Sequence, residues 1–380
     1  MAVNWAQDGR RVVALAAGGT GGHLFPAQAL AEALIARDYV IHLMTDMRVK
    51  DYGRNFPALE VHEVPSATLS LKDPHLLPRR ALSLWSGYRK AKAALQRFKP
   101  VALVGFGGYP SFPPVLAASR LKIPTIIHEQ NAVMGRANRG LVRFANAVAS
   151  SFPAIARLPD GAAGKVRHTG NPVRASVLEF AGAPYTPAEA VQPFRILVFG
   201  GSQGARFFAD FMPDVLKAMP HAVLRYIEIV QQCRPEDIDR VRDHYTSLEL
   251  RFELHSFFAD MPKRMADAHL VICRAGASTI AELGVIGRPA VMVPLPHALD
   301  NDQLNNARSF AGGGGGWVRP QAELKADEFA AFLTRLRYED AELMLAAQAA
   351  AAQGRPDAAE RLADLVEELA GVPQQEKTRP

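Results

Sequence analysis

Two glycine-rich turns combine backbone freedom with polar residues suited to binding an anion. The first reads Gly18-Gly19-Thr20-Gly21-Gly22-His23 and the second Gly200-Gly201-Ser202-Gln203-Gly204. Each follows an apolar run and precedes a segment of helical composition, so free N–H groups and the dipole of a helix start favour phosphate there. Tight helix–strand packing is the alternative reading of either turn. Neither turn has the spacing of a dinucleotide fingerprint or of a P-loop, so the inference depends on finding two turns in corresponding places.

Two side chains near these turns could contact a nucleotide. Glu282 follows a second strand exit and helix start, where a carboxylate can accept hydrogen bonds from two ribose hydroxyls. The same position would also let it interact favourably with a helix dipole. Ser202 could offer its N–H and hydroxyl to a phosphate, or act as a helix N-cap. The residues alone leave these alternatives open.

Apolar runs and amphipathic segments alternate along the chain, which is typical of parallel sheets covered on both faces. The pattern of strand, glycine turn and helix occurs once near the N-terminus and restarts at residue 194. The sequence therefore predicts an α/β protein with two doubly wound domains whose ligands bind beyond the carboxyl ends of the strands. The expected strands are 11–16, 39–44, 101–104, 125–127, 194–199, 224–230, 270–272 and 290–293, and the expected helices are 26–37, 205–219 and 356–369.

The expected domains are residues 1–168, residues 169–355, and a C-terminal helix and tail at 356–380 that could pack back on the first domain. A chain of 380 residues with 48% apolar and 22% charged residues suits two globular domains. Its two cysteines give neither a metal spacing nor a disulfide framework, which fits a reducing compartment. No signal peptide is evident, and no window approaches the roughly 18 apolar residues of a membrane span, so we expect a soluble or peripheral protein.

Seven segments occur in order between Val12 and Ala307: GGTGGHLFPAQALAEAL, GFGGYPSFPPVLAA, HEQNAVMGRANR, GNPVR, GGSQGAR, CRAGASTIAEL and PAVMVPLPHALDNDQLNNA. In this combination the chain resembles the MurG family of bacterial N-acetylglucosaminyltransferases, which convert lipid I to lipid II in peptidoglycan synthesis. The resemblance implies a GT-B architecture, with two Rossmann-like domains facing across a cleft. It implies an inverting transfer of GlcNAc from UDP-GlcNAc to the 4-hydroxyl of MurNAc in an undecaprenyl-diphosphate-linked MurNAc-pentapeptide. It also implies a peripheral enzyme on the cytoplasmic face of the inner membrane, without a tightly bound cofactor.

The resemblance further implies which residues bind the donor. Glu282 matches a ribose ligand, Arg174 a nucleotide-sugar contact, and Gln303 a residue whose amide suits vicinal GlcNAc hydroxyls. Phe258, preceded by Phe257, matches a stretch that binds uracil partly through its backbone. The full donor set is Thr20, Gly21, Gly22, Asn131, Arg174, Ser202, Phe258, Ala277, Ser278, Thr279, Ile280, Ala281, Glu282 and Gln303. Tyr109 matches a position on the acceptor side.

Transfer to a hydroxyl needs a general base. His23 ends the first glycine turn and has a suitable intrinsic pKa, so we favour it as the base. Glu129, which follows the strand at 125–127, is the rival, and we expect both residues in the active site. His23 could instead hold the diphosphate, and Glu129 could be structural.

Asp300-Asn301-Asp302 fits the D-x-D pattern of metal-dependent transferases. Such triplets arise often by chance, and helix N-termini can stabilise departing UDP without a metal, so we expect no metal site.

Three features depart from the family pattern. Ala209 stands where the family has an asparagine, and Gln231-Gln232-Cys233-Arg234 replaces a His-Gln-x-Gly segment. The run Gly312 to Gly316 is unusually rich in glycine. Fine details of the second domain are therefore open, while the donor motifs are intact.

The segment His75 to Pro100 contains seven Lys or Arg residues, no Asp or Glu, and several apolar and aromatic residues. Basic charge with interfacial aromatics suits anionic lipid headgroups, so we expect this segment to contact the membrane. An ordinary surface helix that packs its apolar stripe inward is the alternative.

Three other functions are compatible with parts of the sequence. A related GT-B transferase could act on another lipid acceptor, and a UDP-GlcNAc epimerase would also have two Rossmann-like domains. The net charge of +6 would suit a nucleic-acid-binding protein. No RNA- or DNA-binding motif accompanies the basic segment, so we expect no nucleic-acid partner.

Overall fold

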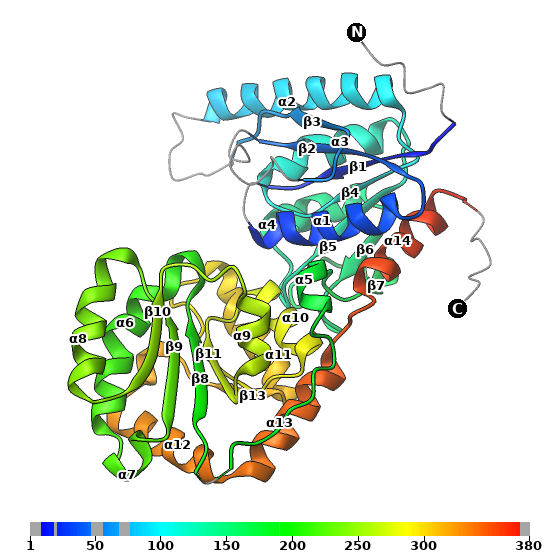
Figure 1. Ribbon diagram of the computed structural model, residues 1–380. Helices are drawn as coiled ribbons and strands as arrows, with labels where there is room; N and C mark the ends of the chain where they lie inside the picture. The colour runs from blue at the N-terminus through cyan, green and yellow to red at the C-terminus, as the bar shows by residue number, and fades with distance from the viewer. Residues whose placement is uncertain (1–8, 19–20, 47–55, 68–76, 190, 373–380) are drawn as a thin grey trace. The chain divides into compact units, whose positions relative to one another are not determined.

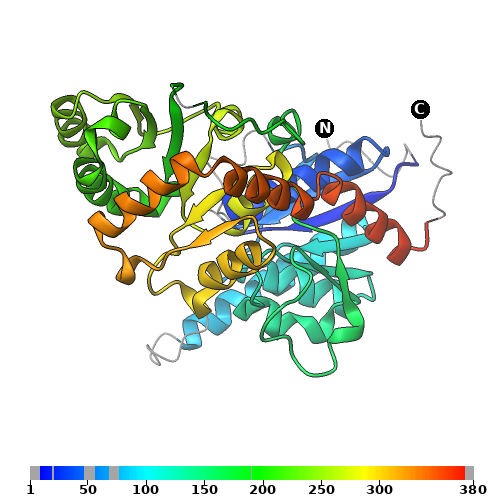
Figure 2. The ribbon, with the colours of Figure 1, turned by 90° about the horizontal axis from the view of Figure 1, so that it is seen from below.

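The computed structural model describes residues 9–18, 21–46, 56–67, 77–189 and 191–372. The chain forms two compact units. Unit 1 comprises the residues up to Arg174 and those from Arg355 onward, and unit 2 comprises Ala175–Gly354. The sequence predicts boundaries at 168 and 355, whereas the structure divides the chain after Arg174 and after Gly354. Figures 1 and 2 show the elements of both units from two directions.

Unit 1 contains a seven-stranded sheet in the order β3-β2-β1-β4-β5-β6-β7, and every neighbouring pair is parallel. Its strands are β1 (Val12–Ala16), β2 (Val40–Thr45), β3 (Glu60–Glu63), β4 (Ala102–Gly105), β5 (Thr125–Glu129), β6 (Ala147–Ser150) and β7 (Val166–His168). Its helices are α1 (Gly21–Ile35), α2 (Leu77–Phe98), α3 (Phe112–Arg120), α4 (Arg136–Leu141) and α14 (Ala358–Leu369).

Alternation along β1 assigns these helices to the two faces of the sheet. Val13 and Leu15 pack in one cluster with residues of α1 and α14, while Ala14 and Ala16 pack in another with residues of α2 and α3. Successive side chains of a strand point to opposite faces, so a fully buried strand needs apolar residues at every position. The composition Val-Val-Ala-Leu-Ala meets this requirement.

The C-terminal helix α14 belongs to unit 1. Figure 1 shows α14 beside α1, and an arginine that follows α1 joins the two. The guanidinium of Arg37 contacts Asp364 at 2.8 Å and Glu367 at 2.7 Å, and it also pairs with Glu360. One cation facing three carboxylates fixes the packing of α14 on the unit that contains the N-terminal residues.

Unit 2 contains a six-stranded, all-parallel sheet in the order β10-β9-β8-β11-β12-β13. Its strands are β8 (Phe194–Phe199), β9 (Ile227–Gln232), β10 (Arg251–His255), β11 (Leu270–Cys273), β12 (Ala290–Met292) and β13 (Gly316–Val318). Its helices are α5 (Ala175–Leu178), α6 (Gly201–Ala218), α7 (His221–Leu224), α8 (Ile238–Ser247), α9 (Met261–Asp267), α10 (Ala277–Ile286), α11 (Asp302–Gly312), α12 (Ala326–Tyr338) and α13 (Asp340–Gln353).

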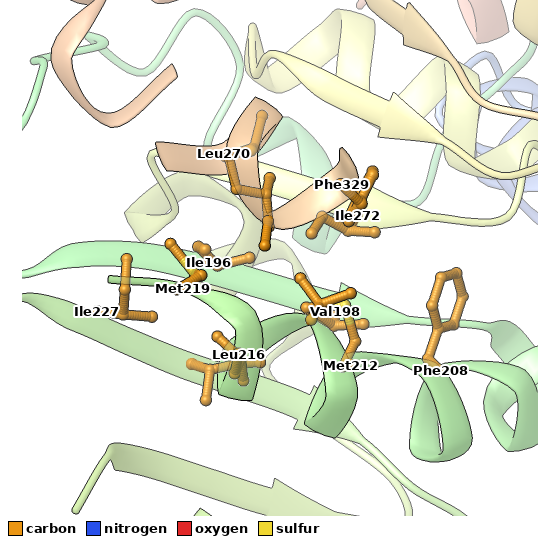
Figure 3. Packing of buried hydrophobic residues seen from close by; sticks show 14 of the residues in the cluster. Ile196, Val198, Phe208, Met212, Leu216, Met219, Ile227, Leu270, Ile272 and Phe329 are labelled. Atoms are coloured by element: carbon orange, nitrogen blue, oxygen red, sulfur yellow. The ribbon is translucent and has the colours of Figure 1, made fainter. Parts of the chain in front are cut away.

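Figure 3 shows part of the core of unit 2. Ile196 and Val198 of β8 pack there with Phe208, Met212 and Leu216 of α6. The apolar residues of α6 recur at helical spacing and cover the side chains that β8 points to the same side. Together they bury this face of the sheet, next to the turn at Gly200 to Gly204.

The two sheets share one strand order, with the first strand of each unit at the point where the order reverses. In unit 1 that point lies between β1 and β4, and in unit 2 between β8 and β11. Ligands of doubly wound folds bind beyond the carboxyl ends of the strands at such points. The prediction of two doubly wound parallel sheets is confirmed, and both glycine turns follow a strand at a switch point. None of the described helices combines the length and apolar composition that crossing a bilayer requires.

Candidate active site

In unit 1, His23 lies against the turn formed by Gly107 and Gly108, which follows β4. Gly107 and Gly108 have φ values of +84° and +70°, a conformation that favours glycine. A Cβ atom on Gly107 would lie 3.6 Å from His23 Nε2, and one on Gly108 would lie 3.5 Å from His23 Cε1. Both distances are ordinary van der Waals contacts, so the positive φ values, rather than a lack of space, favour glycine at these two positions beside the imidazole. Sequence reasoning did not single out this pair, although the two adjacent glycines after an apolar strand signal a tight turn.

A buried serine connects the ends of β1 and β4. The hydroxyl of Ser111 lies 2.8 Å from the carbonyl oxygen of Ala16 and 2.7 Å from that of Gly107. Ser111 is fully buried in the short 3-10 helix Tyr109–Ser111, which the half-buried Tyr109 begins. Tyr109 is thereby placed at the carboxyl edge of the sheet, close in sequence to the turn that holds His23.

Glu129, the last residue of β5, is almost completely buried, with 1% exposure. Its carboxylate accepts hydrogen bonds from Asn131 N at 3.0 Å, Gly135 N at 2.9 Å and Asn138 Nδ2 at 2.8 Å. Burial raises the pKa of Glu129, and these bonds act in the opposite direction. The carboxylate organises the loop that carries Asn131, whose side chain is half-buried.

His128 precedes Glu129 and points into the interior of unit 1. Its Nε2 lies 3.2 Å from the carbonyl oxygen of Gly170, and Gln130 Nε2 lies 3.1 Å from its Nδ1. Gln130 Nε2 also donates to the carbonyl oxygen of Phe106 at 2.8 Å. Burial lowers the pKa of His128 to about 4, so the ring is neutral at pH 7 and donates from Nε2 to Gly170. Through these bonds, His128 and Gln130 join the end of β5 to the segments that follow β4 and β7.

The remaining predicted positions of unit 1 lie near the start of α1. Arg174 places its guanidinium 4.5 Å from the ring centroid of Phe25, in a cation–π contact. Gly21 lies so close to Phe25 that an added Cβ would be 3.0 Å from that ring. Gly22 is exposed, and Thr20 lies outside the described residues.

In unit 2, α10 begins directly beyond the carboxyl end of β11. Its N-cap residue, Gly276, is extended and has no side chain to cap the helix. The first N–H groups of an α-helix have no partner within the helix, so those of Ala277, Ser278 and Thr279 are of the kind that can donate to an anion. The hydroxyl of Ser278 is buried and has no hydrogen-bond partner among the described residues. A buried hydroxyl without a partner is costly, which points to a ligand that supplies one.

Glu282 lies in the second turn of α10 rather than the first, and its side chain is half-buried. The helix dipole acts mainly on the first turn, so its interaction with Glu282 is weaker than the sequence alternative assumed. Ile280 is buried, whereas Ala281 is half-buried beside Glu282.

Gln303 is oriented by two backbone N–H groups. Its Oε1 accepts from Leu295 N at 2.9 Å and from Ala275 N at 3.3 Å. The amide oxygen is therefore occupied, and the amide nitrogen is the part of Gln303 that can donate to a ligand hydroxyl. The sequence predicts that the amide of Gln303 both donates to and accepts from sugar hydroxyls, whereas the structure leaves only its nitrogen for this role.

Asp302 holds the start of α11 by accepting a hydrogen bond from Gln303 N at 2.7 Å. Burial raises the pKa of its carboxyl group. Asp300 and Asn301 adopt left-handed conformations with φ values of 58° and 55°. The triplet thus forms a turn that begins α11 and aligns Gln303.

A buried arginine fixes the loop next to Gln303. Arg274 donates to the carbonyl oxygens of Val293 and Pro294 at 3.0 and 3.1 Å and to Gln321 Oε1 at 2.7 Å. Burial lowers the pKa of Arg274 to about 10, so the side chain stays charged at pH 7. The role of Arg274 leaves no local signal in the sequence, because its partners lie in the segments after β12 and at Gln321.

The other two predicted donor positions of unit 2 are Ser202 and Phe258. Ser202 lies in the first turn of α6, after Gly201 with a φ of +65°. Phe258 buries its ring against Arg264, whose guanidinium carbon is 4.4 Å from the ring centroid. Its neighbour Phe257 is 76% exposed. A contact of Phe258 with a nucleobase would therefore use main-chain atoms.

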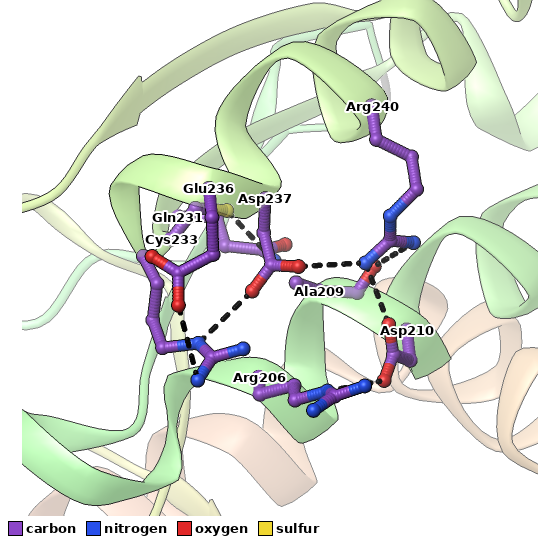
Figure 4. A network of polar contacts seen from close by, with 9 residues as sticks. Arg206, Ala209, Asp210, Gln231, Cys233, Glu236, Asp237 and Arg240 are labelled. Carbon is purple, nitrogen blue, oxygen red and sulfur yellow. Dashed lines mark hydrogen bonds and ion pairs between the residues drawn. The ribbon is translucent and has the colours of Figure 1, made fainter.

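The residues that depart from the family pattern have local partners (Figure 4). Gln231 Nε2 donates to Cys233 Sγ at 3.4 Å. Gln231 Oε1 also accepts from the Tyr245 hydroxyl at 2.6 Å. The carbonyl oxygen of Ala209 accepts from Arg240 Nη1 at 3.3 Å. These contacts join α6, β9 and α8 within unit 2.

Comparisons with known proteins agree with this architecture. The glycosyltransferase family 28 N-terminal domain matches residues 13–150, and the family 28 C-terminal domain matches residues 195–362. The chain belongs to glycosyltransferase family 28. Among its family 28 relatives is the UDP-N-acetylglucosamine--N-acetylmuramyl-(pentapeptide) pyrophosphoryl-undecaprenol N-acetylglucosamine transferase of Rhizobium leguminosarum bv. trifolii. That enzyme is 50% identical over 362 residues, which cover 94% of this chain and 96% of the relative.

Solved structures place the family 28 chain among two-domain GT-B-like proteins. Acinetobacter baumannii MurG matches with a TM-score of 0.78 and 28% identity, covering 94% of this chain and 99% of that one. The UDP-GlcNAc 2-epimerase of Neisseria meningitidis, bound to UDP-GlcNAc, matches with a TM-score of 0.66 and 14% identity, covering 94% of this chain and 100% of that one. At that identity the epimerase shares the fold alone. The predicted resemblance to the MurG family is confirmed by the relatives that share sequence as well as fold.

Proposed function

We propose that this chain transfers GlcNAc from UDP-GlcNAc to the 4-hydroxyl of MurNAc in an undecaprenyl-diphosphate-linked MurNAc-pentapeptide. The observation that carries the proposal is the 50% identity, over nearly its whole length, to an enzyme named for this transfer. The reaction forms one glycosidic bond at the anomeric carbon and breaks the bond from that carbon to UDP. A single displacement inverts the anomeric configuration.

Unit 2 binds the donor in this proposal. The N-termini of α6 and α10 face the diphosphate, where their N–H groups stabilise the charge that develops on departing UDP. The Ser278 hydroxyl gains a partner when the nucleotide binds, and Glu282 accepts from the ribose hydroxyls. The amide nitrogen of Gln303 donates to a GlcNAc hydroxyl, and Phe258 offers main-chain atoms to uracil.

Unit 1 activates and holds the acceptor. His23 takes the proton of the attacking hydroxyl, since an imidazole against a glycine turn has room for a sugar beside it. Glu129 acts through the loop that it organises, which presents Asn131. Tyr109, at the same edge of the sheet, contacts the acceptor. Glu129 is a positioning residue in this arrangement because backbone and amide donors occupy its carboxylate.

An acceptor-dependent assay tests the proposed reaction. UDP release from UDP-GlcNAc should require a lipid I analogue, and mass spectrometry should find the GlcNAc-extended acceptor. Conversion of UDP-GlcNAc without an acceptor would support epimerase chemistry instead. Transfer to diacylglycerol but not to the lipid I analogue would identify a related lipid glycosyltransferase.

Helix α2 is the surface that we propose to contact the membrane. Leu82 and Trp85 in its first half are 66% and 58% exposed, and Arg89 stacks on Trp85 at 4.9 Å. A groove of about 370 Å³ lies beside Trp85, between α2 and α3, and is lined mainly by apolar residues. The second half of α2 packs inward through Ala91 and Leu95. The inward packing of the second half agrees with the ordinary surface helix, while the exposed first half supports the proposal of membrane contact. His75 lies outside the described residues.

Replacing Arg89, Lys90 and Lys92 together by glutamine should weaken binding to anionic liposomes by about 10- to 100-fold at low salt. Each basic residue near an anionic surface contributes attraction that salt screens. Cosedimentation measures the effect, and calorimetry should find UDP-GlcNAc affinity unchanged.

A charge-matched control replaces the exposed residues Lys217, Arg251 and Arg308 of unit 2 by glutamine. Its liposome binding should stay near that of the parent protein. Equal loss in both triple variants would mean that net charge, rather than α2, governs binding.

A further inference from the structure

Three side chains with metal-binding chemistry meet on one face of the sheet in unit 1. His42 comes from β2, and Glu60 and His62 come from the edge strand β3. The parallel register pairs His42 with Glu60, while Glu60 and His62 are two residues apart and so point to the same side. One potential ligand atom from each residue lies within 4.8 Å of the others.

The nitrogen atoms of the two imidazoles face each other directly. His42 Nδ1 lies 2.9 Å from His62 Nε2, and Glu60 Oε2 lies 3.8 Å from the same His42 nitrogen. Two nitrogens bound to one tetrahedral Zn²⁺ at about 2.0–2.1 Å are about 3.3 Å apart. To admit a tetrahedral ion, the two nitrogens would need to separate by a few tenths of an ångström, and the rings would need to turn so that both lone pairs point at the ion.

Residues at the end of α2 hold this arrangement. Phe98 stacks on both imidazoles, with ring centroids 4.2 Å from His42 and 5.2 Å from His62. Arg97 pairs with Glu60 at 2.6 Å and orients its carboxylate. Stacking and pairing limit the rotamers of the three residues, which reduces the entropy lost when they bind an ion together.

The three side chains become more exposed to solvent in the order His42, His62, Glu60. The side chains of His42, His62 and Glu60 are 3%, 11% and 44% exposed. An ion could enter from the Glu60 side, where a water molecule could complete the coordination.

We propose that His42 Nδ1, His62 Nε2 and a carboxylate oxygen of Glu60 bind one Zn²⁺-class cation. Two imidazoles and one carboxylate suit Zn²⁺, whereas Mg²⁺ and Ca²⁺ prefer oxygen ligands alone. The bound ion would tie the edge strand β3 to β2 beneath the end of α2. Sequence analysis predicted no metal site, because the ligands are far apart in the chain and β3 was not foreseen.

The competing explanation is a hydrogen bond between the two histidines with no metal. In that state His42 Nδ1–H donates to His62 Nε2, and one proton occupies the position proposed for the ion. Binding at Nδ1 moves the proton of His42 to Nε2, which is buried and has no hydrogen-bond partner among the described residues. This cost predicts an affinity below that of closed four-ligand structural zinc sites.

Titration of the tag-free full-length protein tests the proposal. Calorimetry should find one saturable Zn²⁺ equivalent, Zn²⁺ should raise the melting temperature, and Co²⁺ should give visible d–d absorption. Glu60→Gln and His62→Gln should each weaken Zn²⁺ binding by about tenfold or more.

The matched control is His255→Gln on β10. His255 and Glu253 have the same spacing as His62 and Glu60, with a 2.9 Å Nε2–Oε1 contact, but they belong to no three-ligand cluster of the described residues. This variant should keep the Zn²⁺ equivalent. Circular dichroism and metal-free melting temperatures check that all variants fold.

Absence of saturable Zn²⁺ binding would overturn the proposal. So would binding that survives His62→Gln in a folded variant. Either result would establish that the two histidines form a hydrogen bond packed on Phe98 and nothing more.

Discussion

Replacing His23 by alanine is expected to lower kcat by about 10²- to 10⁴-fold, the usual contribution of general base catalysis. The KM for UDP-GlcNAc should change little, because the residues proposed to bind the donor in unit 2 are intact. The melting temperature should also change little, since the imidazole is only half-buried against the glycines at 107 and 108. Steady-state kinetics with saturating acceptor, together with calorimetric titration of UDP, measures these quantities separately.

The same measurements distinguish the alternative role of His23. A histidine that held the diphosphate would, once removed, weaken UDP binding and raise KM. His23→Gln retains a hydrogen-bonding side chain but cannot accept the proton, so it should be as slow as His23→Ala if the residue is the base. Near-normal turnover in both variants would remove His23 from the chemistry.

The parts of the fold that the sequence predicted best are those whose signal is local. The strands at 12–16 and 194–199 are apolar except for the exposed Arg195, both are followed by glycines, and the structure places both at switch points. A helix start within residues 274–282 was also foreseen, although it lies earlier than expected, which puts Glu282 in the second turn. Buried parallel strands need continuous apolar residues, so their composition alone marks them.

The strands that were not foreseen are short or polar. β3 reads Glu-Val-His-Glu and β7 reads Val-Arg-His, with half-exposed or exposed positions in both. Edge strands have one neighbour and a partly solvated face, so they lack the apolar signature of central strands. The His42–Glu60–His62 cluster was missed because it depends on β3 pairing with β2.

Side-chain roles in the site were less predictable than positions. Gln303 was foreseen as a sugar ligand, but its oxygen is held by the N–H groups of Ala275 and Leu295. Arg274 and Gln321 are brought together over 47 positions of the chain. Such contacts depend on how loops from different strands converge, which no spacing within one segment encodes.

Substitution of Glu129 is expected to lower both stability and turnover, and it tests whether this residue is the catalytic base or positions the loop. In Glu129→Gln an amide N–H₂ replaces an acceptor, and in Glu129→Ala three donors lose theirs. We expect each variant to lower the free energy of unfolding by about 3 kcal/mol, because buried donors without a partner cost about 1–3 kcal/mol each. Urea denaturation measures this loss, and turnover should fall with it because the loop that carries Asn131 loses its support.

The contrast with a catalytic role depends on Asn138, which donates to Glu129 from Nδ2 at 2.8 Å. If Glu129 positions the loop, Asn138→Ala removes part of the same support and should reproduce part of the loss in both stability and kcat. Glu328→Gln is the control, since Glu328 is exposed on α12 and pairs only at the surface. If Glu129 were the base, Glu129→Gln would lose far more turnover than its loss of stability explains, and Asn138→Ala, which keeps the carboxylate, would lose stability but retain most of its turnover. The donors that fill the carboxylate of Glu129 make the first outcome the expected one, and they leave His23 to accept the proton.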